Sequence, residues 1–415
     1  MQLKEILNLQ IWFTGNGQAL TKYSLVYFSL LTCFSKASDL QFELSLAEQV
    51  FFEDALIEGV DYQSNFRLEL GVEYQRFFFG DEWDFSFSGR MTFDEHDRNR
   101  RRGDIEESFI RYQRDSFDLS LGVLKEFWGV AESKHLVDVI NQSNIADNID
   151  EESKLGQPAL KIQTHFNWGS MQFFWMPWFR ERMFSDKSAR VRPRLPISDQ
   201  KANYESSDGE NHHDYAIRYS HTLGDWDIGL SYFEGTAREP ELIAEIESDN
   251  QLSLIPFYKQ VKQSSIDLQY TGAGLLLKFE GVHRNEDVSE FRYYYAMVTG
   301  FEYTQIGILG SAADLGYLAE YLYDERGEET APFADDVFLG LRFVQNNVAQ
   351  SVYLVGVYVD LETQSRVLRI EIESRIRDGL TLTFEGQGFQ NQTADSLFYD
   401  FRRDDYAELK LTWFF

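Results

Sequence analysis

The sequence is nearly free of cysteine and poor in proline: one cysteine, Cys33, and seven prolines occur in 415 residues. A single cysteine excludes an internal disulfide and a metal site built from cysteines. Few prolines suit a chain whose backbone N–H groups mostly join hydrogen-bonded ladders. Long apolar runs are also missing, because the longest, residues 23–34, is shorter than the ~20 residues that a membrane-spanning helix needs. A membrane protein built of spanning helices is therefore excluded.

Basic residues are in the minority. Lys and Arg number 39 against 68 Asp and Glu, which gives a formal net charge of −29 and a pI near 4.6. This balance argues against nucleic-acid binding, which requires a basic face. Two interpretations of the acidity remain open. It keeps the protein soluble, or it places acidic loops where they meet divalent cations or lipopolysaccharide.

The N-terminal region has the order of a secretory signal peptide. Lys22 precedes the apolar run, and Ser35-Lys36-Ala37 follows it with small residues at positions −3 and −1. We expect residues 20–37 to be a signal peptide that is cleaved after Ala37. Residues 1–19 precede this leader, so we also expect that translation begins near Leu20. Mass spectrometry of the precursor would contradict that start by finding peptides from residues 1–19.

From residue 40 onward, apolar and polar residues alternate with a period of two, as in residues 67–74 (RLELGVEY). This alternation predicts strands with two different faces. We expect about eighteen strands, with sixteen to twenty possible. We assign residues 252–260 to an outside loop. No convincing amphipathic helix longer than about two turns appears, and the best candidates are short pieces inside loops at 240–246 and 311–315. The predicted strands begin near residues 40, 64, 83, 105, 117, 159, 171, 213, 225, 263, 274, 292, 314, 335, 349, 364, 379 and 402.

The predicted connections alternate between short turns and long loops, of which 128–158, 180–212 and 238–262 are the longest. This alternation predicts that residues 38–415 form an all-β transmembrane antiparallel β-barrel with short periplasmic turns and long extracellular loops. The alternative is a soluble β-sandwich. A sandwich is disfavoured because nearly every predicted strand has one apolar face and one face that carries charged residues.

The last strand carries this pattern to the C-terminus. Phe415, Trp413, Leu411, Leu409 and Ala407 share one face, and Phe414, Thr412, Lys410, Glu408 and Tyr406 share the other. So apolar an edge would promote aggregation in a soluble protein, whereas pairing with the first strand, near residues 40–52, removes the edge. The terminal Phe and the apolar residues at alternate positions resemble the signal by which the barrel-assembly machinery recognises its substrates.

The faces opposite the apolar ones predict the residues of the lumen. Charges of both signs on this wall must be hydrated or paired. Hydrated charges would line a diffusion channel, which we favour because eighteen strands leave room for one. Paired charges would form a rigid wall around a plugged lumen. The lumen-lining candidates are Arg67, Glu69, Glu73, Lys278, Glu280, Arg284, Arg342, Arg369, Glu371, Glu373, Arg375, Glu385, Glu408 and Lys410.

Two long loops contribute further candidates. The loop 130–158 is apolar in its first half, so we expect it to fold back and narrow the pore, with His135, Asp138 and Asn141 as constriction candidates. The loop 180–212 holds a basic cluster for which two interpretations stand. It attracts anions at the mouth, or its arginines pair with acidic neighbours. The cluster comprises Arg180, Arg182, Arg190, Arg192 and Arg194.

Motifs of known catalytic or metal chemistry are missing. The sequence has no serine in a nucleophile elbow, no HExxH and no glycine-rich phosphate loop. The loop acids at 147 and 150–152 lack the spacing of an EF-hand. We therefore expect no enzymatic activity, no cofactor and no metal. The least favoured alternative is a hydrolase at the outer rim that uses His213 and Asp214.

Several stretches resemble a family of uncharacterised outer-membrane proteins of Gram-negative bacteria that are related to porin-like barrels. The stretches are FWGVAESKHLVDVIN (127–141), PFYKQVKQSSIDLQY (256–270), GSAADLGYLAEYLYDERG (310–327), PFADDVFLGLRF (332–343) and RRDDYAELKLTWFF (402–415). The resemblance implies an outer-membrane barrel but no substrate. We expect outer-membrane lipid, lipopolysaccharide and small solutes as partners. The favoured function is passive or selective diffusion of small solutes. The alternative is a plugged barrel with a structural, adhesive or lipid-exporting role.

Overall fold

A computed structural model describes residues 39–415, apart from 80–81, 199, 247–251, 287–291 and 329. The expected signal peptide and the expected translation start lie outside the described residues. Among the described residues, no helix is long and apolar enough to cross a membrane.

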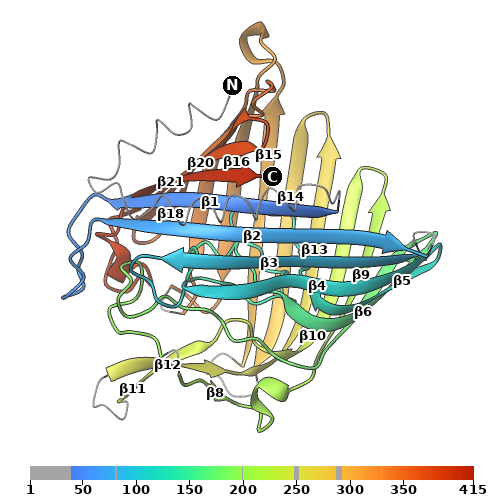
Figure 1. Cartoon of the computed structure of the whole chain (residues 1–415), viewed down its shortest axis with the longest axis horizontal. Helices are drawn as coiled ribbons and strands as arrows, with labels where there is room; N and C mark the ends of the chain where they lie inside the picture. The colour runs from blue at the N-terminus through green and yellow to red at the C-terminus, as the bar shows by residue number, and fades with distance from the viewer. Residues whose placement is uncertain (1–38, 80–81, 199, 247–251, 287–291, 329) are drawn as a thin grey trace, which may run out of the picture.

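Eighteen antiparallel strands form one closed barrel (Figure 1). The first strand, β1 (Leu40–Phe51), pairs with the last, β21 (Tyr406–Phe414), so the barrel wall has no free edge. The predicted fold class and strand number are confirmed. The remaining wall strands follow one another in chain order: β2 (Ser64–Phe78), β3 (Trp83–Asp94), β4 (Arg102–Arg114), β5 (Phe117–Leu124), β6 (Gln157–Phe166), β7 (Gly169–Met176), β9 (Asp214–Leu223), β10 (Trp226–Thr236), β13 (Gln260–Gly272), β14 (Leu275–Glu286), β15 (Tyr293–Gln305), β16 (Asp314–Asp324), β17 (Asp335–Val344), β18 (Val352–Asp360), β19 (Arg366–Arg377) and β20 (Leu380–Gln390).

The predicted strand starts agree with the structure. The largest difference is at the last strand, predicted from residue 402 and beginning at Tyr406. The helix candidates at 240–246 and 311–315 are not helices. The first segment is a strand, β11 (Glu241–Ile246), because β12 (Leu252–Tyr258) offers it a full antiparallel partner. The second follows a short 3-10 turn, Ile308–Gly310, and consists of a bend at 311–312 and the start of β16 at Asp314.

The two ends of the barrel differ in their connections. At one end, two-residue turns join strands at 115–116, 167–168, 224–225, 273–274 and 378–379. Ala273 and Gly274 both have positive φ, which suits a tight hairpin. At the other end, loops of up to several dozen residues carry the small sheet of β11, β12 and β8 (Asn203–Tyr204), seen at the bottom of Figure 1. We call these the short-turn end and the long-loop end.

The outer face of the wall is apolar and exposed. Leu70, Leu121, Leu341 and Leu409 are among the exposed side chains that make up this face. Aromatic side chains gather near the short turns, where Phe166 and Trp168 stack at 4.7 Å between ring centroids. A belt of aliphatic side chains edged by aromatic ones is the surface that a membrane-spanning barrel presents to lipid.

The inner face is apolar near the long-loop end. Phe174, Phe233 and Phe338 of the wall are buried there and pack against loop residues. This half of the barrel therefore contains a hydrophobic core. This core is not predicted from the sequence, whose inward positions carry mainly charged residues.

Candidate functional site

The candidate site is built around residues 125–156, which connect β5 to β6 and which we call the crossing segment. Val137 and Ile140 of this segment are fully buried, and they pack against the inner face of the wall. The segment starts at β5 and contacts Glu280 on β14 and Glu320 on β16, which lie six and eight strands away round an eighteen-stranded wall. Such a contact joins nearly opposite sides of the barrel, so the segment crosses the lumen.

Glu280 anchors the middle of the crossing segment. Its carboxylate is fully buried and accepts hydrogen bonds from the backbone N–H groups of Val130 (2.7 Å), Ala131 (2.9 Å) and Val137 (3.2 Å). Hydrogen bonds from N–H groups to a carboxylate are stronger than those between neutral groups. Backbone N–H groups from both ends of residues 130–137 therefore converge on one carboxylate of the wall, that of Glu280.

Glu320 provides a second anchor beside the first. It is buried and accepts hydrogen bonds from the backbone N–H of Glu132 (2.9 Å) and from both the N–H (2.8 Å) and the hydroxyl (2.6 Å) of Ser133. Tyr358 on β18 donates its hydroxyl to the carbonyl of Ser133 at 2.9 Å. Three strands of the wall therefore hold four consecutive residues of the segment.

The three constriction candidates differ in exposure and in their contacts. Asn141 is buried and joins the two ends of the segment, because its amide donates to the carbonyls of Leu124 and Leu155 at 2.8 Å each. Asp138 is buried and pairs with Lys154 at 3.3 Å. The imidazole of His135 is mostly covered and lies 3.3 Å from the carboxylate of Glu152 and 4.0 Å from that of Glu280.

His135 is held in its charged form. Burial alone lowers the pKa of an imidazole, but the carboxylates of Glu152 and Glu280 outweigh burial here and raise the pKa of His135 to about 10. The imidazolium therefore offsets part of the buried charge of Glu280 at neutral pH.

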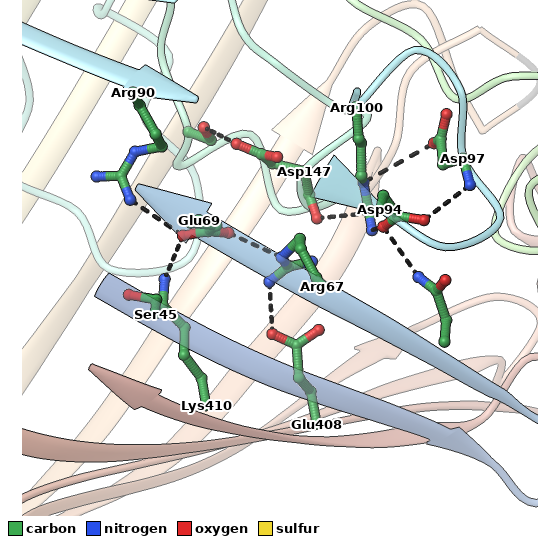
Figure 2. Close-up of polar contacts among 12 residues, drawn as sticks. Ser45, Arg67, Glu69, Arg90, Asp94, Asp97, Arg100, Asp147, Glu408 and Lys410 are labelled. Atoms are coloured by element: carbon green, nitrogen blue, oxygen red, sulfur yellow. Dashed lines mark hydrogen bonds and ion pairs between the residues drawn. The ribbon is translucent and has the colours of Figure 1, made fainter. Parts of the chain in front are cut away.

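Charged side chains of the wall are cross-paired on the side of β1, β2 and β21. Figure 2 shows Arg67 and Glu69 of β2 directed toward Glu408 and Lys410 of β21, across β1. Arg67 contacts Glu69 at 2.8 Å and Glu408 at 2.6 Å, and Lys410 lies 3.2 Å from Glu69. Ala47 of β1 lies directly between Arg67 and Lys410 and is small and buried, which leaves room for these side chains to meet above it.

The opposite side of the wall is paired in the same way. Arg342 contacts Glu302 on β15 at 3.0 Å and Glu132 of the crossing segment at 2.6 Å. Lys278 lies 3.7 Å from Glu302, and Arg284 donates to Gln263 at 2.7 Å. On this side of the wall, the crossing segment therefore contacts one basic residue, Arg342, in addition to the two acidic residues Glu280 and Glu320.

The remaining lumen candidates lie on β2, β19 and β20. Arg369 pairs with Glu371 and lies 3.8 Å from Asp150 of the crossing segment. Glu371 is directly opposite Glu385, and both are partly exposed. Glu73 and Glu373 are exposed, and Arg375 donates to Gln350 in a turn. These last three lie toward the short turns and away from the crossing segment.

The basic cluster of 180–212 is largely engaged within the protein. Arg180 pairs with Asp104 (2.8 Å), Arg182 with Glu151 (2.7 Å) and Arg190 with Asp404 (2.7 Å). Burial raises the pKa of Asp404 to about 6, although Arg190 opposes this rise. Arg192 donates to the carbonyls at 187, 193 and 194, and the exposed Arg194 donates its backbone N–H to Asp400 at 2.9 Å.

A cavity of about 600 Å³, which we call the vestibule, lies among the long loops beside the crossing segment. Ser133, Lys134 and Asp150 of the crossing segment line it together with wall residues such as Arg369 and Tyr358. A smaller cavity of about 180 Å³ lies among β4, β5 and β6 and the start of the crossing segment. The crossing segment contributes residues to both cavities.

The vestibule combines paired charges with aromatic surfaces. Phe333 stacks on Tyr358 with ring centroids 4.2 Å apart, and the ring of Phe398 is tilted against it at 5.1 Å. Arg326, Arg369 and Lys259 face it, as do Glu239, Asp150 and Glu241. Burial raises the pKa of Asp150 to about 6, against the opposing charge of Arg369. A cavity of this size, with apolar and polar groups, has the dimensions of a small-molecule site.

The pair of His213 and Asp214, on which the least favoured alternative depends, does not form. Asp214 accepts a hydrogen bond from Nδ1 of His212 at 2.9 Å, which raises the pKa of His212, and pairs with Arg238 at 2.8 Å. His213 instead packs edge-on against Trp175. Alternation at the start of β9 explains the difference, because neighbouring residues of a strand point to opposite faces.

Several functional residues were missed by sequence reasoning. Glu302 and Glu320 lie on predicted strands at inward positions but stand outside the clear alternating runs. Arg218 forms a two-fold contact with Asp267 at 2.7 and 2.8 Å across β10. Gly229 lies beneath this pair, where a Cβ atom would approach Asp267 to 2.3 Å. A glycine inside an alternating strand was the available signal.

The fold has relatives of known structure, although no protein-family model and no curated protein matches the sequence. Wzi, an outer-membrane protein of Escherichia coli described as a carbohydrate-binding β-barrel involved in group 1 capsule assembly, is similar over 94% of this chain and 87% of its own, with 11% identity and a TM-score of 0.53. A porin variant from Rhodopseudomonas blastica is similar over 91% and 99%, with 10% identity and a TM-score of 0.43.

The chain has the fold of an outer-membrane β-barrel. This likeness supports the barrel fold that the resemblance seen in the sequence implies. Membership of the uncharacterised family stays a prediction. At 11% identity the likeness to Wzi is one of fold, so residue roles must be argued from this chain alone.

Proposed function

We propose that this porin-like barrel lies in the outer membrane and takes up small polar solutes selectively, by binding them in the vestibule next to a narrowed lumen. In such barrels the long loops face the outside and the short turns face the periplasm. A solute from outside would then meet the vestibule before it meets the crossing segment.

The observation that carries this proposal is the attachment of residues 130–137 to Glu280 and Glu320. A loop tied at several points to the far wall reduces the free cross-section of the lumen. The vestibule on its outer side offers aromatic faces and charged groups, which together suit a hydroxyl-rich solute of carbohydrate size. Wzi is described as carbohydrate-binding, which makes sugars the first ligands to test here.

Solute flux into liposomes tests the proposal. We expect the rate of swelling to saturate as the concentration of a transported sugar rises, because passage requires a binding step. A flux that grows linearly with concentration for all small solutes would indicate an open diffusion pore. No flux for any solute would contradict uptake altogether.

The second candidate function is a plugged barrel with a structural or adhesive role at the surface. The hydrophobic core inside the long-loop half favours it, because Val137, Ile140 and Phe174 are excluded from water there. The same liposomes separate the candidates, since a plugged barrel retains ligand binding at the vestibule but gives no flux.

A further inference from the structure

Three carboxylates meet at the long-loop rim, away from the anchors of the crossing segment. Glu328 lies in the loop between β16 and β17, Asp336 at the start of β17 and Asp360 at the end of β18. One carboxylate oxygen from each residue lies within 4.8 Å of the other two. All three side chains line a small cavity of about 20 Å³, which is room for one ion or one water molecule.

Two of these side chains are buried and incompletely paired. Asp336 is 4% exposed and Asp360 is 3% exposed. The Oδ2 atom of each is buried without a hydrogen-bond partner among the described residues. The other oxygen of Asp360 accepts the hydroxyl of Thr363 at 2.6 Å. Each aspartate thus presents one unused oxygen that bulk water does not reach, and such a group is costly unless a ligand satisfies it.

Electrostatic repulsion makes the arrangement unfavourable by itself. Asp336 and Asp360 are direct cross-strand neighbours, a position in which like charges destabilise a sheet. In the part of the chain that the structure describes, no lysine or arginine lies within ion-pair distance, 4.0 Å, of any of the three. The charge of Lys134 acts on Asp336, but its ammonium group donates to the carbonyl of Pro332 at 3.1 Å.

The geometry points to a calcium site formed by Glu328, Asp336 and Asp360. Calcium binds carboxylate oxygens at about 2.4 Å, so two ligands of one ion are at most about 4.8 Å apart, the separation that these three oxygens meet. Calcium also accepts the irregular ligand sets that a loop and two strand ends provide, whereas magnesium requires a near-ideal octahedron. The ion would join the loop 325–334 to the rim beside Phe333, and so brace one wall of the vestibule.

Isothermal titration of the purified, detergent-solubilised protein with CaCl2 tests this site, over the range of about 10⁻⁴–10⁻³ M that is usual for extracellular calcium sites. We expect the wild type to bind one calcium ion that the Asp336→Asn variant does not bind, or binds at least about tenfold more weakly. Asp335→Asn is the matched control, because Asp335 is the next residue but accepts the hydroxyl of Tyr321 instead. A wild-type protein with the same calcium curve as Asp336→Asn would overturn the proposal.

Thermal unfolding provides a second test, because the effect of the substitution on the unfolding temperature should depend on calcium only if Asp336 binds the ion. With calcium present, we expect Asp336→Asn to unfold at a lower temperature than the wild type. With EDTA, we expect the order to reverse, because the variant no longer has two facing buried charges. If Asp336→Asn is less stable than the wild type both with calcium and with EDTA, the proposed site is contradicted. If Asp336→Asn does not fold, Glu328→Gln in the loop after β16 allows the same comparison.

Discussion

At the scale of single residues, the approach of the crossing segment to Glu280 depends on Gly129. Gly129 has a φ of +137°, and a Cβ atom there would lie 2.9 Å from an Oε1 atom of Glu280 and 3.1 Å from the ring of His135. Both the backbone conformation and the space therefore require glycine.

We expect Gly129→Ala to destabilise the anchored state of the crossing segment by about 1–3 kcal/mol. Hydrogen exchange at the amides of Val130 and Ala131 measures this, since both donate to Glu280. Gly59→Ala is the control, because Gly59 also has positive φ but no neighbouring atom within 4 Å of the added Cβ. Equal effects on these two amides in both variants would mean that contact with Glu280 does not matter.

His135 makes the anchoring dependent on pH. Its folded-state pKa, about 10, lies above the ordinary value of about 6.5, so its contribution to stability is complete below about pH 6.5 and is lost as the pH rises toward 10. We expect the unfolding temperature to fall across this window in the wild type and to fall less in His135→Gln. Identical pH profiles would contradict the charged imidazole.

At the scale of elements, the seam between β1, β2 and β21 closes the barrel. Arg67 is buried and its guanidinium group meets Glu408 and Glu69 there. We expect Glu408→Ala to destabilise the barrel by about 3–5 kcal/mol, because it leaves a buried arginine with half of its pairing. Urea unfolding in detergent measures the change. The exposed Glu373→Ala serves as the control, and an equally small effect in both variants would show that the seam pairing is unimportant.

Strands were predictable from the sequence, whereas the contacts of the loops were not. Alternation is a local signal, so residues 67–74 alone define a strand and its two faces. The pairing of Val130 with Glu280 joins residues 150 positions apart, and that of Glu132 with Glu320 joins residues 188 apart. Such contacts depend on the position of each strand in the closed barrel, which no local pattern of the sequence specifies. The sequence identified Glu280 as an inward residue, but not the loop that it holds.

At the scale of the whole molecule, the barrel is divided into two halves. The short-turn half has partly exposed charges on its inner face, as a water-filled lumen requires. The long-loop half has a hydrophobic core, the crossing segment and the vestibule. Uptake through such a barrel requires the crossing segment either to leave a narrow path or to move when a solute binds.

Single-channel conductance in a planar bilayer tests most directly whether the anchored crossing segment limits passage. We predict a small conductance for the wild type and a several-fold larger one for Glu280→Gln/Glu320→Gln, since both anchors lose the charge that holds the backbone N–H groups. Glu73→Gln, which alters an exposed residue of β2, should leave the conductance unchanged. A wild-type conductance as large as that of the double variant would contradict the account.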